Sequence, residues 1–302
     1  MTPEVMRTSL LAGLLALPCV ALLPAAASGA PKAKKAPHQM VDSSPSAGGP
    51  TGKASVCGVK VFPLAVGNTW TYVMVPSPLP PDNQIKPISP PQAKQIDITV
   101  KDITGGTKGA DTVVTLEEKT TIDLTKDAKK PQLDEKTVQT TITCNAKKFE
   151  ISPDSFFFSG EPGGYIGMKL DDVQHLKGTS WQLTNGGIGE GEWREDLSAK
   201  WTRLPHEGSE AKLGSGKIEL ERRFTPQPQE SISAKAGVYT TEKLGLITTG
   251  RVTLDTPVSP DTKPFELPAN WITTIWVAPG AGIVQTLNPY AHMYQLSAAT
   301  LK

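Results

Sequence analysis

The chain contains few of the residues on which most metal sites and acid–base sites depend. Its 302 residues include only 3 cysteines and 4 histidines. It also lacks an excess of either charge, since 31 basic and 30 acidic side chains leave a formal net charge of +1. A protein without a net field of one sign has no broad attraction for a polyanion. We therefore predict no nucleic acid among its partners.

Motifs of the common catalytic and cofactor sites are also missing. There is no His-Glu-x-x-His, no Cys-x-x-Cys and no Walker-type phosphate loop. Glycines cluster at 186–191, but their spacing departs from a dinucleotide-binding fingerprint, which favours a hairpin loop. The residues after Gly178 lack the final glycine of a nucleophile elbow. These absences predict a protein that is not an enzyme, with no catalytic residue, no metal site and no cofactor.

Two groups of acidic residues leave alternatives open. The four carboxylates at 190–196 could approach a calcium ion, but without an alternating Asp/Asn pattern a solvated acidic turn is favoured. Asp171 and Asp172 lie close to His175 in the chain, which would suit acid–base chemistry. A polar loop explains these three residues equally well, and we favour the loop.

The amino terminus has the pattern of a secretory signal peptide. Arg7 precedes an uncharged run at 10–23, which suits a signal-peptide core and is too short for a membrane span. Small residues then allow cleavage after Ala27 or Ala30, and we favour Ala30. Cys19 is not interpreted as a lipid-modified cysteine, because Pro18 beside the cleaved bond is a poor match. Residues 1–30 thus predict export to the periplasm or the cell exterior, with no stable membrane span.

Beyond the signal peptide, we expect one globular domain with two irregular segments. Residues 31–55 are rich in Lys, Ala, Pro, Ser and Gly and show no apolar period, which predicts a disordered leader. Residues 56–302 are predicted to form a single β-rich domain. Seven prolines lie at 76–91, and because proline cannot donate to a sheet ladder, this stretch is expected to be an insertion.

The periodicity of the domain is that of strands. Ile96, Ile98 and Val100 alternate with polar residues, as in a half-buried strand. A β-branched and aromatic bias recurs at 70–75, 111–118, 138–144, 217–224, 239–254 and 271–278. The segments 271–278, 283–287 and 292–296 follow one another through short turns, which predicts a C-terminal meander. No long stretch shows a helical apolar period, so the predicted fold class is all-β, with antiparallel neighbours and few helices.

Four motifs, taken in order, carry a family resemblance. They are a strand opening at 62–72 (FPLAVGNTWTY), a glycine-to-tryptophan segment at 176–181 (LKGTSW), a strand start at 236–239 (AGVY) and an ending at 276–284 (WVAPGAGIV). Their order resembles a group of uncharacterised exported bacterial β-rich proteins, which is similar to the half-barrel lipoprotein-localisation factors. The resemblance implies a curved antiparallel sheet, an open half-barrel around an apolar concavity. It implies no catalytic residue.

Aromatic residues are the candidates for a binding surface. The strands that carry the resemblance contain Trp70, Tyr72, Trp181 and Trp276, which we expect to line an apolar pocket on the concave face. The alternative, which the residues alone favour, is that these rings fill the core. Three consecutive phenylalanines at 156–158 cannot all point inward along a strand. At least one of the three is therefore expected to meet a loop, a neighbour or a ligand.

The two cysteines that remain after cleavage, Cys57 and Cys144, are predicted to form a disulfide. Export brings the chain into an oxidising compartment, where a pair of thiols tends to join. The alternative is two separate buried thiols, which exported proteins seldom keep. The bond would tie the start of the domain to the strand at 138–144.

Together these features favour a noncatalytic exported binding domain, with an apolar small molecule or an envelope protein as its partner. A structural or assembly component of the cell envelope, or of an extracellular machine, is the alternative. An enzyme comes third. Bound lipid, a stoichiometric protein partner, or turnover of an ester or glycan panel would distinguish these three classes.

Overall fold

The computed structural model describes residues 48–53, 56–59, 61–78, 93–106, 110–125, 130, 132–145, 147–161, 168–181, 188, 191–203, 214–255 and 263–302. The elements are η2 (Val56–Gly58), β1 (Thr69–Val75), β2 (Ala93–Gly105), β3 (Thr112–Asp123), β4 (Leu133–Cys144), β5 (Phe149–Ile151), α1 (Phe156–Ser159), β6 (Met168–Gly178), β7 (Trp193–Arg203), β8 (Gly214–Ala234), β9 (Gly237–Leu254), β10 (Phe265–Ala278), β11 (Gly282–Leu287) and β12 (Met293–Thr300). The predicted signal peptide and most of the proline-rich insertion at 76–91 lie outside the described residues. Within those residues, no helix has both the length and the apolar character needed to cross a membrane.

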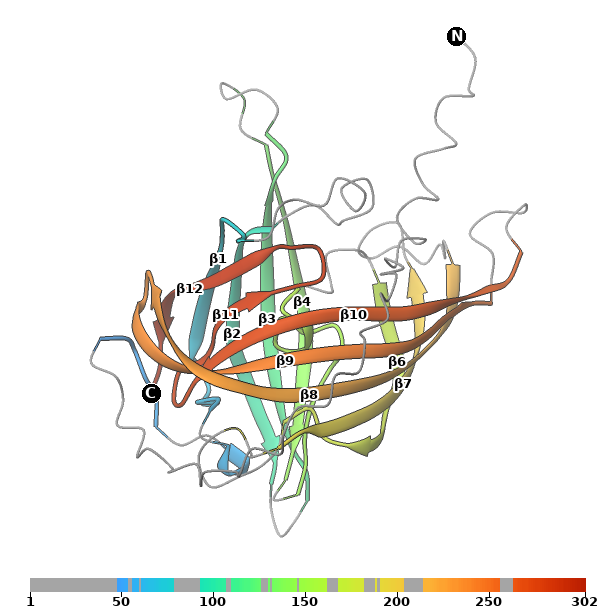
Figure 1. Cartoon of the computed structure of the whole chain (residues 1–302), viewed down its shortest axis with the longest axis horizontal. Coiled ribbons are helices and arrows are strands. Elements are labelled where there is room, and N and C mark those ends of the chain that lie inside the picture. The colour runs from blue at the N-terminus through green and yellow to red at the C-terminus, as the bar shows by residue number, and fades with distance from the viewer. Residues whose placement is uncertain are drawn as a thin grey trace, which may run out of the picture.

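The strands form one antiparallel sheet that joins two meanders. In the described residues the strand order is β5-β4-β3-β2-β1-β12-β11-β10-β9-β8-β7-β6. The meander β1 to β5 meets the meander β6 to β12 where β1 pairs with β12, from Thr69–Thr300 to Val75–Met293. Figure 1 shows the long curved strands β8, β9 and β10 crossing the steep strands β2, β3 and β4. The predicted all-β class, the curved antiparallel sheet and the C-terminal meander β10–β11–β12 are confirmed.

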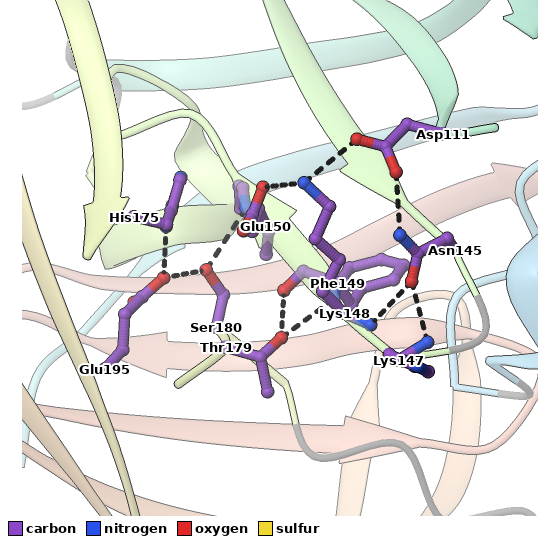
Figure 2. A network of polar contacts seen from close by, with 11 residues as sticks. Asp111, Asn145, Lys147, Lys148, Phe149, Glu150, His175, Thr179, Ser180 and Glu195 are labelled. Carbon is purple, nitrogen blue, oxygen red and sulfur yellow. Dashed lines mark hydrogen bonds and ion pairs between the residues drawn. The ribbon is translucent and has the colours of Figure 1, made fainter. Parts of the chain in front are cut away.

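The two edge strands of this sheet, β5 and β6, are connected by the residues that follow β6. The backbone N–H of Ser180 donates to the carbonyl of Phe149 (3.0 Å), and its hydroxyl accepts from the N–H of Ile151 (3.1 Å). The hydroxyl of Thr179 accepts from the N–H of Phe149 (2.8 Å) and donates to its carbonyl (2.7 Å), as Figure 2 shows. These bonds carry the curved sheet beyond a half-barrel into a nearly closed, barrel-like form.

Gly178 directs the chain into this connection. It ends β6 with φ 76°, a conformation that residues with a side chain rarely adopt. A Cβ atom at this position would lie 1.8 Å from the carbonyl oxygen of Arg194 on β7. The left-handed turn lets the chain leave the β7 ladder, so that Thr179 and Ser180 reach β5.

The last part of the predicted leader belongs to the domain. The N–H of Gly52 donates to the carbonyl of Gly280 (2.7 Å), and the N–H of Lys53 donates to that of Lys302 (2.9 Å). Gly49 lies so close to the ring of Tyr239 that a Cβ atom would be 2.1 Å from it. Residues 48–53 were expected to be disordered. Their contacts depend on backbone groups and on glycine's small size, and composition does not reveal such contacts.

Candidate functional site

Helix α1 places three phenylalanines inside the barrel-like sheet. Ser155 caps it by accepting from the N–H of Phe157 (3.2 Å), and the N–H of Gly160 donates to the carbonyl of Phe156 (2.8 Å). All three rings, including that of Phe158, are at most 4% exposed. Successive side chains leave a helix about 100° apart, whereas they alternate between opposite faces of a strand. A single helical turn therefore buries all three rings, which a strand could not do.

Two of the predicted pocket residues face this helix from β1. The ring centroids of Trp70 and Phe157 lie 5.5 Å apart in an edge-on contact, and those of Tyr72 and Phe156 lie 4.6 Å apart. The indole N–H and the phenol O–H each donate to a backbone carbonyl, of Ala281 and of β11 respectively, at 2.7 and 2.8 Å. Both β1 rings are fully buried, and their polar ends are fixed to β11 and the turn before it, one strand beyond the neighbouring β12.

Trp181 joins the same aromatic cluster through Phe62. The centroids of these two rings lie 5.1 Å apart, and Phe62 lies 5.2 Å from Phe157. We call Phe62, Trp70, Tyr72, Phe156, Phe157 and Trp181 the aromatic cluster. Three of the four residues predicted to line a pocket therefore lie in one place, which is filled by the rings of α1.

Trp276 lies on the opposite face of the sheet. It shares the outer face of β10 with Ile272, which is 61% exposed. Its indole N–H donates to Glu230 (2.9 Å), and the ammonium group of Lys243 lies 5.2 Å from its ring centroid. These long side chains cover the ring and leave it 7% exposed. The structure thus separates Trp276 from the other three predicted residues.

A buried carboxylate, Glu118 of β3, holds the start of α1. It accepts from the hydroxyl of Ser155 (2.5 Å), from the N–H of Phe156 (2.8 Å) and from the hydroxyl of Thr140 (2.7 Å). Burial raises the pKa of Glu118 from 4.5 to about 7, although these three hydrogen bonds act in the opposite direction. The group therefore changes charge near neutral pH inside the protein.

A buried guanidinium group, that of Arg222 on β8, holds the other end of α1. It donates to the carbonyl oxygen of Phe158, and its central carbon lies 3.4 Å from the centroid of that ring. It also donates to Glu195 at 2.7 Å, in an ion pair whose side chains are 2% and 0% exposed. Burial on its own would raise the pKa of Glu195, but Arg222 and further partners lower it below the ordinary value. This carboxylate is therefore ionised at neutral pH.

Figure 2 shows that Glu195 also contacts the residues that connect β5 with β6. It accepts from the hydroxyl of Ser180 (2.6 Å) and lies 2.7 Å from Nδ1 of His175. The carboxylate thus lies between the hydroxyl and the imidazole. An activated serine needs the imidazole next to its hydroxyl, so this order of groups is not that of a catalytic triad.

The chain that follows α1 holds a third acid, Glu161, whose side chain is partly buried and 16% exposed. Glu161 accepts from the side-chain amide of Asn288, and it lies 3.5 Å from Nδ1 of His292. Burial raises the pKa of Glu161 above its ordinary value, although the imidazole of His292 acts in the opposite direction. Three ionisable side chains therefore lie around α1. Glu118 and Arg222 come from the sheet, and Glu161 comes from the chain just after the helix.

The residues at 171–175 lie on strand β6 and those at 195–196 on strand β7, so the expected polar loop and acidic turn are wrong at these positions. Their side chains do not converge. Asp172 forms a surface ion pair with Lys200 (2.5 Å), whereas His175 points to buried Glu195. Asp196 pairs with Arg194 on the outer face, because neighbouring residues of β7 point to opposite sides. Glu190 lies outside the described residues. Among the residues that are described, no group of three potential metal ligands occurs.

A surface depression of about 600 Å³ crosses the outer side of β6 to β10. Charged residues that already pair with one another surround it, Arg194 with Glu221 and Arg251 with Glu219. It is lined by Leu176, Arg194, Asp196, Leu197, Glu219, Leu220, Glu221, Gly250, Arg251, Glu266 and Pro268. None of the four predicted aromatic residues is part of this depression.

Only one of the two cysteines predicted to form a disulfide has a side chain within the described part of the chain. Cys144 ends β4, is fully buried and is disulfide-bonded, while the side chain of Cys57 in η2 lies outside the described part of the chain. The pairing of these two cysteines therefore stays a prediction. Peptide mapping of the exported protein without reductant should give one joined peptide pair containing both. Two alkylatable thiols in the native protein would contradict it.

Known proteins similar to this chain are found among solved structures and not among family models. No protein-family model matches the chain, and no curated protein matches it. A predicted lipoprotein from Parabacteroides distasonis is similar in structure, with 12% identity over 80% of this chain and 99% of that chain, at a TM-score of 0.46. A predicted exported protein with a YmcC-like fold from Bacteroides fragilis gives 13% identity, the same two coverages and a TM-score of 0.43. Neither is named as a lipoprotein-localisation factor, so the resemblance to that group stays an expectation.

Proposed function

We propose that the protein is a noncatalytic exported binding domain whose partner is an apolar small molecule held inside the sheet. The observation that carries this proposal is the aromatic cluster, in which Trp70 and Tyr72 contact the rings of Phe157 and Phe156 and Trp181 joins through Phe62. Barrels of about eight strands are filled by side chains of their own strands. This larger sheet also needs the side chains of a connecting helix. An interior wide enough for that helix is wide enough for a ligand of similar size.

The polar groups around the cluster support binding rather than catalysis. Glu118 and Arg222 each place hydrogen-bonding atoms beside the apolar interior, where they can orient a polar end of a ligand. Ser180 donates to the carboxylate of Glu195, whose ion pair with Arg222 lowers its pKa below the ordinary value and makes it a weak base for activating a hydroxyl. Export is proposed from the signal-peptide pattern at 1–30.

Uptake of a fluorescent fatty-acid probe by the purified mature protein tests this function. We expect saturable uptake with one site per chain. Trp70→Phe should weaken the affinity for the probe about tenfold. The phenylalanine ring is smaller, and the variant loses the hydrogen bond to the carbonyl of Ala281 in the turn before β11, so the lining of the interior changes. Trp276→Phe is the matched control, since it also loses one indole hydrogen bond but lies on the outer face. Its affinity should stay within about twofold of the wild type.

Thermal unfolding of both variants shows whether a loss of affinity reflects a loss of fold. Wild-type protein that takes up no probe would contradict the proposed function. Equal losses in the two tryptophan variants would contradict the interior position of the site.

An envelope protein as partner is a second candidate, which one feature of the outer face favours. Ile247 of β9 and Ile272 of β10 are register partners, and they are 42% and 61% exposed. A structural or assembly role would use such a surface. In that case Ile272→Ser should abolish a stoichiometric complex with an envelope protein and leave probe uptake unchanged.

A further inference from the structure

Helix α1 is attached to the molecule differently from the rest of the core. The helix takes no part in the strand pairings of the sheet, so no ladder hydrogen bond holds it. Ring contacts and side-chain bonds hold it in place, from Glu118 at its start and from Arg222 and Thr286 at its end. The ladder bonds of the surrounding strands can therefore persist when this turn of helix moves.

We infer that α1 occupies the protein's own ligand site, and that an acyl chain with a carboxylate or ester head binds by displacing it. This inference rests on the proposed function. In the resting protein, the rings of Phe156 and Phe157 take the place of the acyl chain against Trp70 and Tyr72. The carbonyl oxygen of Phe158 takes the place of the ligand's head group.

The guanidinium group of Arg222 determines the chemistry of that head group. One of its nitrogens donates to Glu195 and the other to the carbonyl of Phe158. Displacement of α1 would leave the second nitrogen buried without an acceptor, which is costly for a charged donor. A carbonyl-type oxygen restores the bond, and an ionised carboxylate does so with a charge-assisted one. A pure hydrocarbon does not restore it.

Glu118 adds a second requirement at the start of α1. When the helix leaves, this carboxyl loses the donors of Ser155 and Phe156 and keeps Thr140. Its pKa of about 7 allows it to lose its charge in the apolar surroundings that an acyl chain creates. A lipid can thus replace α1 beside Glu118 without leaving an unpaired charge buried at this position.

Two variants test the displacement, one that removes a ring of the aromatic cluster and one that removes a ring packed against it. Phe157→Ala removes a ring from α1, and Phe149→Ala removes one from β5 that stacks on Phe62 at 5.7 Å. A ligand that competes with α1 for the site binds more tightly when the contacts that hold α1 in the site are weakened. We expect Phe157→Ala to raise the affinity for the fluorescent fatty-acid probe about tenfold or more, and Phe149→Ala to leave it within about twofold.

Hydrogen exchange of the wild-type protein tests the movement directly. The amides of residues 156–160 should exchange faster when the protein is saturated with probe, because the bonds of Phe156 to Glu118 and of Gly160 to Phe156 are lost. Competition by decanoate, methyl decanoate and decane tests the head group. The two oxygen-bearing compounds should displace the probe about tenfold better than decane, and the order of decanoate and its ester shows which head is preferred.

The outcomes separate this inference from the proposed function. Uptake by the wild type with unchanged exchange at 156–160, or equal effects of the two phenylalanine variants, overturns displacement and leaves the binding function intact. No uptake by any of the proteins overturns both. Uptake by Phe157→Ala alone supports α1 as the occupant of the site and overturns ligand binding by the resting wild-type protein. Equal displacement by decane overturns the assigned head group.

Discussion

Replacing Arg222 by methionine is expected to lower the free energy of unfolding by about 3–5 kcal/mol. The exchange leaves the carboxylate of Glu195, which is 0% exposed, without its cationic partner inside the protein. It also removes the donor to the carbonyl of Phe158. Urea unfolding followed by tryptophan fluorescence measures the change.

Two further variants show that the effect comes from the uncompensated charge. Arg223→Met changes the next residue, which is 56% exposed and pairs with Glu221 on the surface, and should cost less than about 1 kcal/mol. Arg222→Met combined with Glu195→Gln removes both charges and should recover part of the loss. A double variant less stable than Arg222→Met would contradict the explanation.

Raising the pH from about 5 to about 8 is expected to destabilise the fold by up to about 3 kcal/mol through Glu118. The pKa of this group is about 7 in the folded protein against an ordinary 4.5. Between these values the folded state binds more protons than the unfolded state, so the free energy of unfolding falls as the pH rises. At pH values below about 4.5 and above about 7, the ionisation of Glu118 causes no further change in the free energy of unfolding.

Glu118→Gln isolates this contribution from that of other acids. Burial also raises the pKa values of Asp154 and Glu161, and these groups act in the same direction. Tyr72 faces Glu118, but its pKa is raised well above 10 and it stays neutral throughout this range. Urea midpoints at pH 5.5 and 8 should differ less in the variant than in the wild type. An equal pH dependence of the two proteins would exclude Glu118 as the source.

The alternation of apolar residues predicted most of the strands and the shared face of the β1 rings, but it missed β5, β6 and β7. The strands β6 and β7 include residues that were expected to form a polar loop and an acidic turn, because their many charged side chains hide the apolar period. Trp70 and Tyr72 are two residues apart, so they share a face, and β1 packs that face inward. The position of β1 beside β12 could not be predicted in the same way. That pairing joins residues more than two hundred positions apart, and no local pattern specifies it.

The ionisable residues around α1 were missed, although the sequence contains a signal for them. Glu118 follows the inward positions Val114 and Leu116, and Arg222 lies between the inward positions Leu220 and Phe224. A charge at an inward position of a strand needs a buried partner, which makes such residues candidates for a polar site. Glu195 occupies the same kind of position on β7 but was grouped with its acidic neighbours.

Helix α1 was missed for a different reason. One turn of four residues is too short for a helical period, and it forms because Ser155, Gly160 and the surrounding side chains stabilise its ends. The phenylalanine run at 156–158 was recognised as an exception to strand alternation. Its conformation depends on tertiary contacts that the sequence does not encode locally.

The pairing of β1 with β12 has a consequence for biosynthesis. The strand made first in the domain has its second neighbour among the residues made last, since β12 ends at Thr300. The amino-terminal meander therefore keeps an open edge until β12, the last strand of the sheet in chain order, has been synthesised, and completion of the sheet is a late event in the folding of this domain.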